Sequence, residues 1–476
     1  MRKFDTKVQF VKYHVLREVA KFAWEGTLSE NLLSIPKIIN PGNVATMRCC
    51  VYKERAILGE RIKLAIGGDK TNPNIIEAIE IACDDCPMGG YEITGACRGC
   101  MARRCEDVCR PRAISFNGDN PAHIDKSKCV DCGLCAKVCP FNAIINHKRP
   151  CEQSCEVGAI HMSETKAAKI DNDKCISCGA CVYQCPWGAL MDKSFILDAI
   201  DIIKKSEDNQ KYKTYAVVAP AVSSQFVYAK LGQVMSGIKK LGFNTIVEAA
   251  IGADMVAYAE ATELAEKGFL TSSCCPAFVD YVKKRFPDLA CHISHNLSPA
   301  AAIAKHIKEN DKTAKVVFIG PCLAKKMERQ AEAVSPYIDC VITFEELQAL
   351  FDSKDIDISN LEESDLNDAS SYGRLFARVG GLSDALEQAI REHKIENFEL
   401  RAAVCDGIED CRVELIKTQK KVQTANFIEG MACEHGCIGG AGCLTHGGRG
   451  RNKVESYSDE ASKNTIKEAL ATFGIF

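Results

Sequence analysis

The spacing of apolar residues predicts a domain of alternating strands and helices in the second half of the chain. KTYAVVAPAV (213–222) is a continuous apolar run followed by a loop, as expected of a buried strand. ADMVAYAEATELAEKG (253–268) has helical spacing, with Asp254 as the expected N-cap and Gly268 as the expected C-cap. We therefore expect an α/β domain over residues 210–476.

The first half of the chain lacks this regular alternation. Residues 1–90 have a mixed, helix-prone pattern, and residues 91–190 are rich in cysteine. MDKSFILDAIDIIKKSED (191–208) is amphipathic and predicts a helix that connects the cysteine-rich module to the α/β domain. The pattern therefore predicts three successive parts.

Charge and composition narrow the class of protein. The net charge of −3 gives no general attraction to nucleic acid. The chain has no run of 18 apolar residues, so we expect no membrane span. Its first twenty residues lack the apolar core of a signal peptide. We therefore expect a cytoplasmic protein with neither a membrane nor a nucleic acid as partner, in a compartment that keeps thiols reduced.

The cysteines change this ordinary picture. The chain has 28 of them, and 18 precede residue 190, many in C-x2-C pairs. In a reducing compartment this pattern indicates metal or iron–sulfur ligands instead of disulfides. Residues 129–140 and 175–186 match the ferredoxin run C-x2-C-x2-C-x3-C-P, whose fourth cysteine serves the other cluster of a pair. A zinc site would instead close with four ligands in two knuckles.

These runs and two looser copies define an α+β, ferredoxin-like module. Its expected iron ligands are Cys97, Cys100, Cys105, Cys109, Cys129, Cys132, Cys135, Cys139, Cys155, Cys175, Cys178, Cys181 and Cys185. These ligands predict three clusters. The sequence leaves open the roles of five more cysteines, which could help to build a fourth cluster: Cys49, Cys50, Cys83, Cys86 and Cys151.

The pairing of the ligands has two solutions. In one, two tandem ferredoxin units follow each other, because 20 residues separate Cys109 from Cys129 and also Cys155 from Cys175. The first unit then holds Cys97, Cys100 and Cys105 with Cys139, and Cys129, Cys132 and Cys135 with Cys109; the second holds Cys175, Cys178 and Cys181 with Cys155. In the other, the 129–139 and 175–185 segments form one unit with 140–170 inserted. Both solutions give three [4Fe–4S] clusters, which in a row would carry electrons.

Three cysteine-containing segments of the α/β domain supply a destination for those electrons. They read TSSCCPAFV, FIGPCLAKKMERQ and FIEGMACEHGCIGGAGC. Cys275, Cys322, Cys433 and Cys437 could bind one more cubane, with the last two on one face of a helical turn. Cys274 would then be a spare thiol. Pro276 is expected to open a helix whose positive end lowers the pKa of that thiol.

The three segments resemble the signatures of the iron–iron (FeFe) hydrogenases. Ser273-Cys274-Cys275-Pro276 matches the first, Pro321-Cys322 with Lys325 and Glu328 matches the second, and Met431-Ala432-Cys433 with Gly436-Cys437 matches the third. The resemblance covers about residues 125–450, including the ferredoxin module. It implies a two-lobed α/β catalytic domain with the H-cluster between the lobes, a [4Fe–4S] cubane joined to a di-iron unit carrying CO, cyanide and azadithiolate.

The resemblance also implies roles for individual residues. Cys275, Cys322, Cys433 and Cys437 would hold the cubane, with Cys437 bridging to the di-iron unit. Lys325 would donate a hydrogen bond to a cyanide. Cys274 would deliver protons, supplied by a relay through Glu260, Ser294, Glu263 and Lys267. Glu260, Glu263 and Lys267 share one helix face by spacing, although such a face is ordinarily just a solvated one.

Other positions depart from the well-studied members of that family. Gly320, Ala221 and Ala300 stand where those members have methionine, serine and glutamine, and the third segment adds Cys443. Such changes alter contacts around a redox centre while keeping its ligands. The sequence therefore resembles the divergent branch called group B.

The leading functional hypothesis is a ferredoxin-coupled hydrogenase, an oxidoreductase that interconverts H2 with protons and electrons. It implies a ferredoxin or similar low-potential carrier and dedicated maturation proteins as partners. The alternatives are a non-catalytic relative that serves iron–sulfur assembly and a plain electron-transfer polyferredoxin. Cys274 and Lys325 distinguish them, because only the di-iron chemistry requires both.

Overall fold

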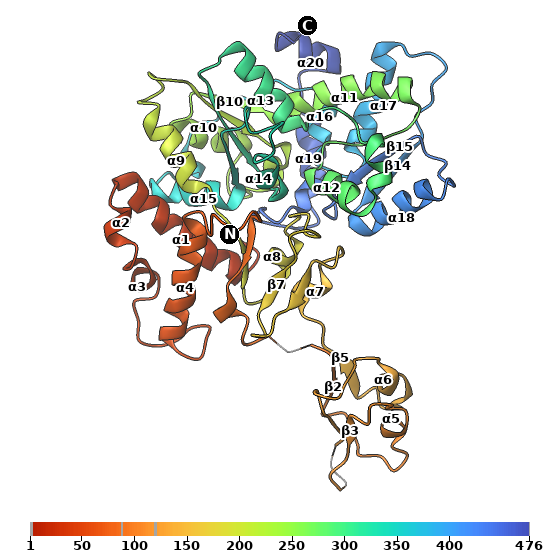
Figure 1. The fold of residues 1–476 in the computed structure, drawn as a ribbon. Coiled ribbons are helices and arrows are strands. Elements are labelled where there is room, and N and C mark those ends of the chain that lie inside the picture. Colours follow the sequence, from red (N-terminus) through yellow and green to blue (C-terminus); the bar gives the residue numbers. More distant parts are fainter. Residues whose placement is uncertain (1–2, 87–88, 119–120, 476) are drawn as a thin grey trace.

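The computed structural model describes residues 3–86, 89–118 and 121–475. A helical N-terminal region and a large α/β body lie together, while a small unit of residues 89–147 projects from them (Figure 1). Among the helices described, none is long and apolar enough to cross a membrane.

Four helices form the N-terminal region: α1 (Lys7–Glu25), α2 (Leu28–Asn31), α3 (Ile35–Ile39) and α4 (Val51–Ala65). α1 begins with a capping box, in which the Thr6 hydroxyl accepts from the Gln9 amide at 3.1 Å, and it ends at Gly26 in the left-handed conformation. Its apolar side chains, including Leu16 and Val19, belong to the same buried core as the α/β body. The region therefore packs on that body as part of one core.

The cysteine-rich part consists of short strands and one-turn helices. In chain order they are β1 (Ile76–Ala78), the 3-10 helix η1 (Glu80–Ala82), β2 (Tyr91–Ile93), α5 (Arg104–Asp107), β3 (Ile114–Ser115), β4 (His123–Ile124), α6 (Leu134–Val138), β5 (Ile144–Asn146), α7 (Pro150–Gln153), β6 (Ile160–Met162), β7 (Ala168–Ile170), α8 (Ala180–Gln184) and β8 (Leu190–Asp192). All pairs are antiparallel: β1 with β8, β2 with β5, β3 with β4, and β6 with β7.

The connecting helix is shorter than its sequence pattern predicts. α9 spans Ile196–Lys205, because residues up to Asp192 complete strand β8 against β1. Ser194 then turns the chain, and its hydroxyl accepts from the Ile196 amide at 3.1 Å. The predicted helix is therefore correct in its body and wrong at its start.

Two parallel sheets form the α/β body. One has the order β10-β9-β12-β13, with β9 (Thr214–Val218), β10 (Thr245–Glu248), β12 (Lys315–Gly320) and β13 (Cys340–Thr343); the other has the order β11-β15-β14, with β11 (Leu270–Thr271), β14 (Ala402–Asp406) and β15 (Phe427–Met431). Residues 213–222 contain β9, as predicted. An α/β domain behind a ferredoxin-like module is thus confirmed.

Helices cover both sheets. They are α10 (Leu231–Leu241), α11 (Ala249–Lys267), α12 (Pro276–Arg285), α13 (Pro299–Asn310), α14 (Ala324–Glu328), α15 (Phe344–Ser353), α16 (Ser371–Leu375), α17 (Gly381–His393), α18 (Ile408–Gln419), α19 (Gly450–Asp459) and α20 (Ile466–Thr472), with 3-10 turns η2 (Pro220–Ser224), η3 (Pro287–His292), η4 (Ile358–Asn360) and η5 (Gly436–Gly439). α11 ends at Gly268 as predicted, but it begins five residues before the expected N-cap, Asp254. Asp254 is instead buried inside the helix, where Ser370 donates to it from both its amide and its hydroxyl.

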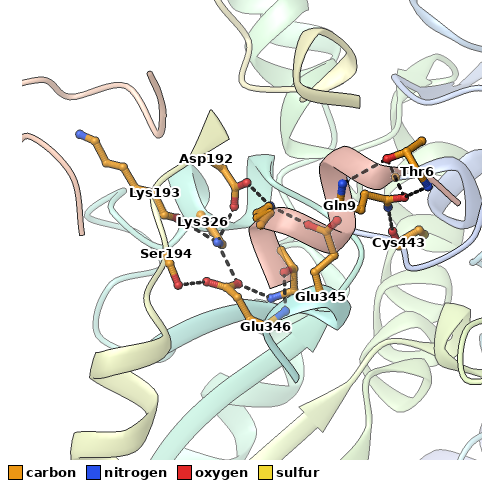
Figure 2. Close-up of polar contacts among 12 residues, drawn as sticks. Thr6, Gln9, Asp192, Lys193, Ser194, Lys326, Glu345, Glu346 and Cys443 are labelled. Atoms are coloured by element: carbon orange, nitrogen blue, oxygen red, sulfur yellow. Dashed lines mark hydrogen bonds and ion pairs between the residues drawn. The ribbon is translucent and has the colours of Figure 1, made fainter. Parts of the chain in front are cut away.

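A buried ionic network ties the parts together (Figure 2). Lys326 of α14 pairs with Asp192 at the end of β8 at 2.8 Å and with Glu346 of α15 at 2.9 Å. Asp192 also pairs with Lys12 of α1, which reaches Glu345 at 2.6 Å. Removing one member of such a network leaves a buried charge unpaired. The network therefore fixes the N-terminal helix and the cysteine-rich part relative to the α/β body.

Candidate functional site

Three cysteine-bearing loops begin where parallel strands end. Cys274 and Cys275 follow β11, Cys322 follows β12, and Cys433 and Cys437 follow β15. β11 and β15 are neighbours in one sheet, whereas β12 belongs to the other. The carboxyl ends of parallel strands are the usual ligand sites of open α/β sheets. Both sheets therefore contribute to one site.

Four of these thiols, each half-buried, lie near one another. Burial and then the neighbouring Cys275 raise the pKa of Cys322 to about 11. Burial, followed by Cys322 and Cys275, raises the pKa of Cys437 to about 12. The pKa of Cys433 is raised well above its ordinary value by burial and by the other three. The loops thus bring together the four thiols that the sequence proposes as cubane ligands.

This donor set fits an iron–sulfur cluster. Four half-buried thiolates close together are unfavourable without a positive partner, which bound iron would supply. Among the residues that the structure describes, no three His, Cys, Asp or Glu side chains are arranged to hold a metal ion. A cubane needs a wider arrangement, because each sulfur reaches a different iron. The local prediction for the last two ligands is wrong: Cys437 lies in η5, but Cys433 precedes that helix instead of sharing its face.

Cys274 lies beside this four-thiol site. α12 begins at Pro276, as predicted, with Cys275 as its N-cap. The expected lowering of the Cys274 pKa is wrong, because burial, followed by Cys275 and Glu260, raises it well above the ordinary value. Desolvation of the thiolate outweighs the helix dipole at this position.

Glu260 of α11 is the nearest acidic group to that thiol along the predicted relay. It has no exposed surface and accepts a hydrogen bond from the Ser273 hydroxyl at 3.2 Å. Its Oε2 atom has no hydrogen-bond partner among the described residues, which leaves an acceptor free on the buried carboxylate. Burial raises the pKa of Glu260 to about 7, with Ser294 and Ser273 limiting the rise. A carboxyl group with this pKa can both accept and release a proton near neutral pH.

The outer part of the relay is hydrogen-bonded. The Ser294 hydroxyl donates to Glu263 Oε2 at 2.9 Å, and Lys267 Nζ pairs with Glu263 Oε1 at 2.7 Å. Burial alone would raise the pKa of Glu263, but Lys267 and the His295 amide hold it below its usual value. The Lys267 side chain is 34% exposed. Groups that can carry protons therefore extend from the surface to Glu260.

Lys325 of α14 is buried next to the four thiols. Its Nζ donates to Glu328 Oε2 at 2.8 Å, which joins two residues of the second motif. Burial alone would lower the pKa of Lys325, but Glu328 and Cys322 hold it above its usual value. The site thus contains one fixed positive charge that faces the thiols.

The projecting unit groups its cysteines around two cavities. Cys97, Cys100, Cys105 and Cys139 line one, and Cys109, Cys129, Cys132 and Cys135 line the other. These are the two ligand sets of the tandem-unit solution. The pairing of segment 129–139 with 175–185 would require ligands from the projecting unit and from the body to share a cluster.

A further set of thiols lies against the α/β body. Burial, and then Cys175 and Cys155, raise the pKa of Cys178 to about 12, and the pKa of Cys181 is raised by burial and by those three. Cys178 in turn is among the groups that raise the pKa of Cys433. A cluster on these four thiols would therefore neighbour the four-thiol site. Cys185, the remaining predicted iron ligand, does not belong to this set of four thiols.

Two family models match the chain. One, described as the C-terminal domain of the iron-only hydrogenase large subunit, matches residues 212–441. The other, a 4Fe-4S binding domain, matches residues 122–145 and 168–191. The first match includes all three cysteine-bearing loops, except for the end of the third loop beyond residue 441.

The chain is an FeFe-hydrogenase-like protein. NADP-reducing hydrogenase subunit HndD of Solidesulfovibrio fructosivorans is 27% identical over 438 residues, 76% of this chain and 67% of that protein. Iron hydrogenase 1 of Clostridium pasteurianum is 27% identical over 259 residues, 44% of this chain and less than half (45%) of that protein. Cytosolic Fe-S cluster assembly factor NAR1 of Kluyveromyces lactis is 35% identical over 94 residues, 20% of each.

A solved structure shows the same fold for the body of this FeFe-hydrogenase-like protein. A variant of the [FeFe]-hydrogenase HydA1 from Chlamydomonas reinhardtii aligns with a TM-score of 0.50 at 21% identity, over 59% of this chain and 93% of that one. The low identities agree with a sequence that has diverged from these proteins.

The positions at which this FeFe-hydrogenase-like protein departs from the familiar pattern are packed tightly. Ala221 and Ala300 are buried, with at most 2% of their surface exposed. A Cβ atom at Gly320 would lie 2.7 Å from the ring of Phe318. A methionine at 320 would therefore displace that ring, so the absence of its side chain is built into the packing of β12.

Sequence reasoning missed several polar groups at the site. Ser273 donates to Glu260, and Asn296 Nδ2 donates to Glu263 at 2.9 Å. Glu429 of β15 is fully buried and accepts from the Gly380 amide and from Ser383. Ser273 lies inside a recognised motif, and Glu429 lies two residues before another. Their nearness to these motifs could have identified them from the sequence. Asn296 had no signal in the sequence.

Proposed function

We propose that the protein is a hydrogenase that interconverts H2 with protons and electrons at a di-iron H-cluster. One observation carries the proposal: a row of proton-carrying groups leads from exposed Lys267 through Glu263, Ser294 and Glu260 to the thiol next to the four-thiol site. A buried redox centre that only passes electrons has no need of such a row. A centre that consumes or releases protons requires one.

The residues around the four thiols would hold the cofactor. Cys275, Cys322, Cys433 and Cys437 would ligate the cubane, with Cys437 joining it to the di-iron unit. Lys325 would donate a hydrogen bond to a cyanide ligand, a charge-assisted contact that a neutral residue could not replace. When bound, the di-iron unit supplies the redox chemistry that forms or splits H2.

The protein's own part is proton delivery and the exclusion of water. In the direction of H2 formation, Cys274 releases its proton toward the site and takes another from Glu260. Glu260 is refilled through Ser294 and Glu263 from Lys267 and solvent. A pKa of about 7 lets Glu260 alternate between both states without a large energy gap.

Electrons would enter through the iron–sulfur clusters. We propose a ferredoxin or a similar low-potential carrier as the partner, maturation proteins that build the di-iron unit, and a cytoplasmic location. The proximity of Cys178 to Cys433 supports electron transfer between the last accessory cluster and the H-cluster cubane.

A second candidate is a non-catalytic relative that serves iron–sulfur assembly. The similarity of 94 residues to an assembly factor favours it. Against it stand the buried Lys325–Glu328 pair beside the thiols and the relay to Cys274, which an assembly scaffold does not need.

Infrared spectroscopy separates the two. The full chain, produced anaerobically with a set of hydrogenase maturation proteins, should show carbonyl and cyanide stretching bands, in a region where protein absorbs almost nothing. A known FeFe hydrogenase matured in parallel is the control. If the control shows the bands and this protein, with its cubanes loaded, does not, the hydrogenase proposal fails and the assembly role takes its place.

A further inference from the structure

The cysteine-rich part contains the same small fold twice, one copy inside the other. In the inner copy, β2 pairs with β5 and encloses the hairpin β3–β4. In the outer copy, β1 pairs with β8, and the hairpin β6–β7 lies between them in sequence. The inner copy interrupts the outer one between η1 and α7. Figure 1 shows it as the projecting unit.

Hydrogen bonds match between the copies, atom for atom. The amide following the first strand donates across the pair at 2.8 Å in the inner copy (Thr94 to Ala143) and at 2.7 Å in the outer copy (Ile79 to Ala189). The Sγ atom of Cys139 accepts from the Ala143 amide at 3.4 Å, and that of Cys185 accepts from the Ala189 amide at 3.2 Å. Cys185 therefore occupies in the outer copy the place of Cys139 in the inner one.

The remaining members of that inner ligand set also have counterparts. Cys83-x2-Cys86 has the spacing of Cys97-x2-Cys100 and follows the first strand of its copy in the same way. Cys151 lies in α7, which packs on α8, just as Cys105 lies in α5, which packs on α6. The four inner counterparts line one cavity.

The outer thiols are buried together. Cys83, Cys151 and Cys185 belong to one core cluster, each with less than 9% of its surface exposed. Burial, followed by electrostatic repulsion from Cys185 and then from Cys86 and Cys83 among other groups, raises the pKa of Cys151 to about 12. Four thiols from three separate segments of the chain therefore lie close together.

A buried cation faces these thiols. Arg61 is 4% exposed, and its Nε atom has no hydrogen-bond partner among the described residues. Its Nη2 atom donates to the Trp187 carbonyl at 3.1 Å, and Cys185 is the neighbour that most favours its charge. A buried guanidinium needs an anionic partner. A thiolate-bound iron–sulfur cluster would be one.

We propose that Cys83, Cys86, Cys151 and Cys185 hold a fourth accessory [4Fe–4S] cluster, which completes the outer ferredoxin unit. Cys49 and Cys50, the other open candidates, are excluded from it: they are adjacent in a loop at the surface, and Cys49 is exposed. Cys181 and Cys185 lie one helical turn apart in and after α8. The new cluster would thus be the next centre outward from the one that neighbours the four-thiol site.

Iron content tests the proposal without any hydrogenase chemistry. The full chain is produced without maturation proteins, so that it lacks the di-iron unit, and its clusters are reconstituted anaerobically. We expect about 20 iron atoms per chain, whereas three accessory clusters and the H-cluster cubane would give about 16. Cys151→Ala and Cys86→Ala should each lose about four iron atoms per chain. Cys50→Ala and Cys291→Ala, at exposed or half-buried positions elsewhere, should lose none.

Two results would overturn the proposal. The first is folded Cys151→Ala and Cys86→Ala proteins with the iron content of the wild type. The second is a reduced wild-type protein whose integrated electron paramagnetic resonance signal accounts for four reduced clusters and not five; this measurement decides the matter even if both variants fail to fold. Neither result bears on the infrared test of the catalytic centre, so the two proposals fail separately.

Discussion

At the scale of single residues, Cys274 is the sharpest test of proton delivery. Cys274→Ala removes the thiol nearest the four-thiol site without touching a proposed iron ligand. We expect an unchanged iron content and a fall in H2 evolution of about 10²–10⁴-fold, the usual effect of losing a general acid or base. The rate is measured by gas chromatography with a reduced dye as electron donor.

The matched control is Cys291→Ala, which changes an exposed cysteine in η3. It should leave both the rate and the iron content unaltered. A Cys274→Ala protein that evolves H2 at the wild-type rate would remove Cys274 from the relay, while leaving the assignment of the four ligands intact.

The residues found from sequence are those whose spacing has chemical meaning. Cys322 and Lys325 stand in a recognisable motif, and the structure brings them together. Asn296 was missed because only the folded chain brings it to Glu263. The pKa of Cys274 was predicted in the wrong direction, since a helix start is visible in sequence and the depth of burial is not.

At the scale of elements, the early start of α11 has a measurable effect, because it places Asp254 inside the helix instead of at its N-cap. Asp254 lies inside that helix and binds Ser370, the N-cap of α16. Burial raises the pKa of Asp254 to about 8 from its ordinary value of 3.8. The folded protein thus keeps a proton that the unfolded chain releases, so stability falls as pH rises between these two values.

Asp254→Asn should remove that dependence. Asparagine resembles the protonated acid, and its amide can donate to the Ser370 hydroxyl. The variant should gain on the wild type steadily as pH rises from about 5 to about 8, by at most about 1.4 kcal/mol per pH unit. Thermal unfolding of both proteins across this range measures the difference.

Asp201→Asn provides the comparison, because Asp201 pairs with Lys205 at the surface of α9. Its difference from the wild type should stay constant over the same range. A constant difference for Asp254→Asn as well would show that Asp254 is ionised throughout, against the raised pKa.

Elements were predictable where their pattern is local. The body of α9 and the end of α11 followed from apolar spacing and from Gly268. The start of α9 did not, because β8 forms only by pairing with β1, more than a hundred residues earlier. The nesting of the two ferredoxin copies was hidden for the same reason: no local pattern reports which strand closes which unit.

At the scale of the whole molecule, the inner ferredoxin unit can be removed as a block. The Gly90 carbonyl oxygen and the His147 amide nitrogen are 3.0 Å apart, so the chain enters and leaves the unit at one place. Joining Gly90 to His147 without residues 91–146 should give a folded protein that lacks about eight iron atoms per chain. H2 evolution with a small dye should persist, while ferredoxin-driven evolution should lose most of its rate.

Both the position and the charge of the unit lead us to expect the loss of the ferredoxin-driven rate. The unit projects from the body (Figure 1) and carries five exposed arginines: Arg98, Arg103, Arg104, Arg110 and Arg112. A positive surface speeds the encounter with an acidic electron carrier. Equal ferredoxin-driven rates with and without the unit would show that electrons enter elsewhere, and a truncated chain that fails to fold would show that the unit supports the body.

The nested arrangement also determines the order in which the two ferredoxin units can fold during synthesis of the chain. Cys83 and Cys86 leave the ribosome before the inner unit, whose last strand ends at Asn146. Cys185 follows them by about a hundred residues, which takes about 5–20 seconds of synthesis. The inner unit is therefore the first ferredoxin fold to be completed, and Cys83 and Cys86 wait longer for the last thiol of their proposed cluster than any inner thiol waits for its own.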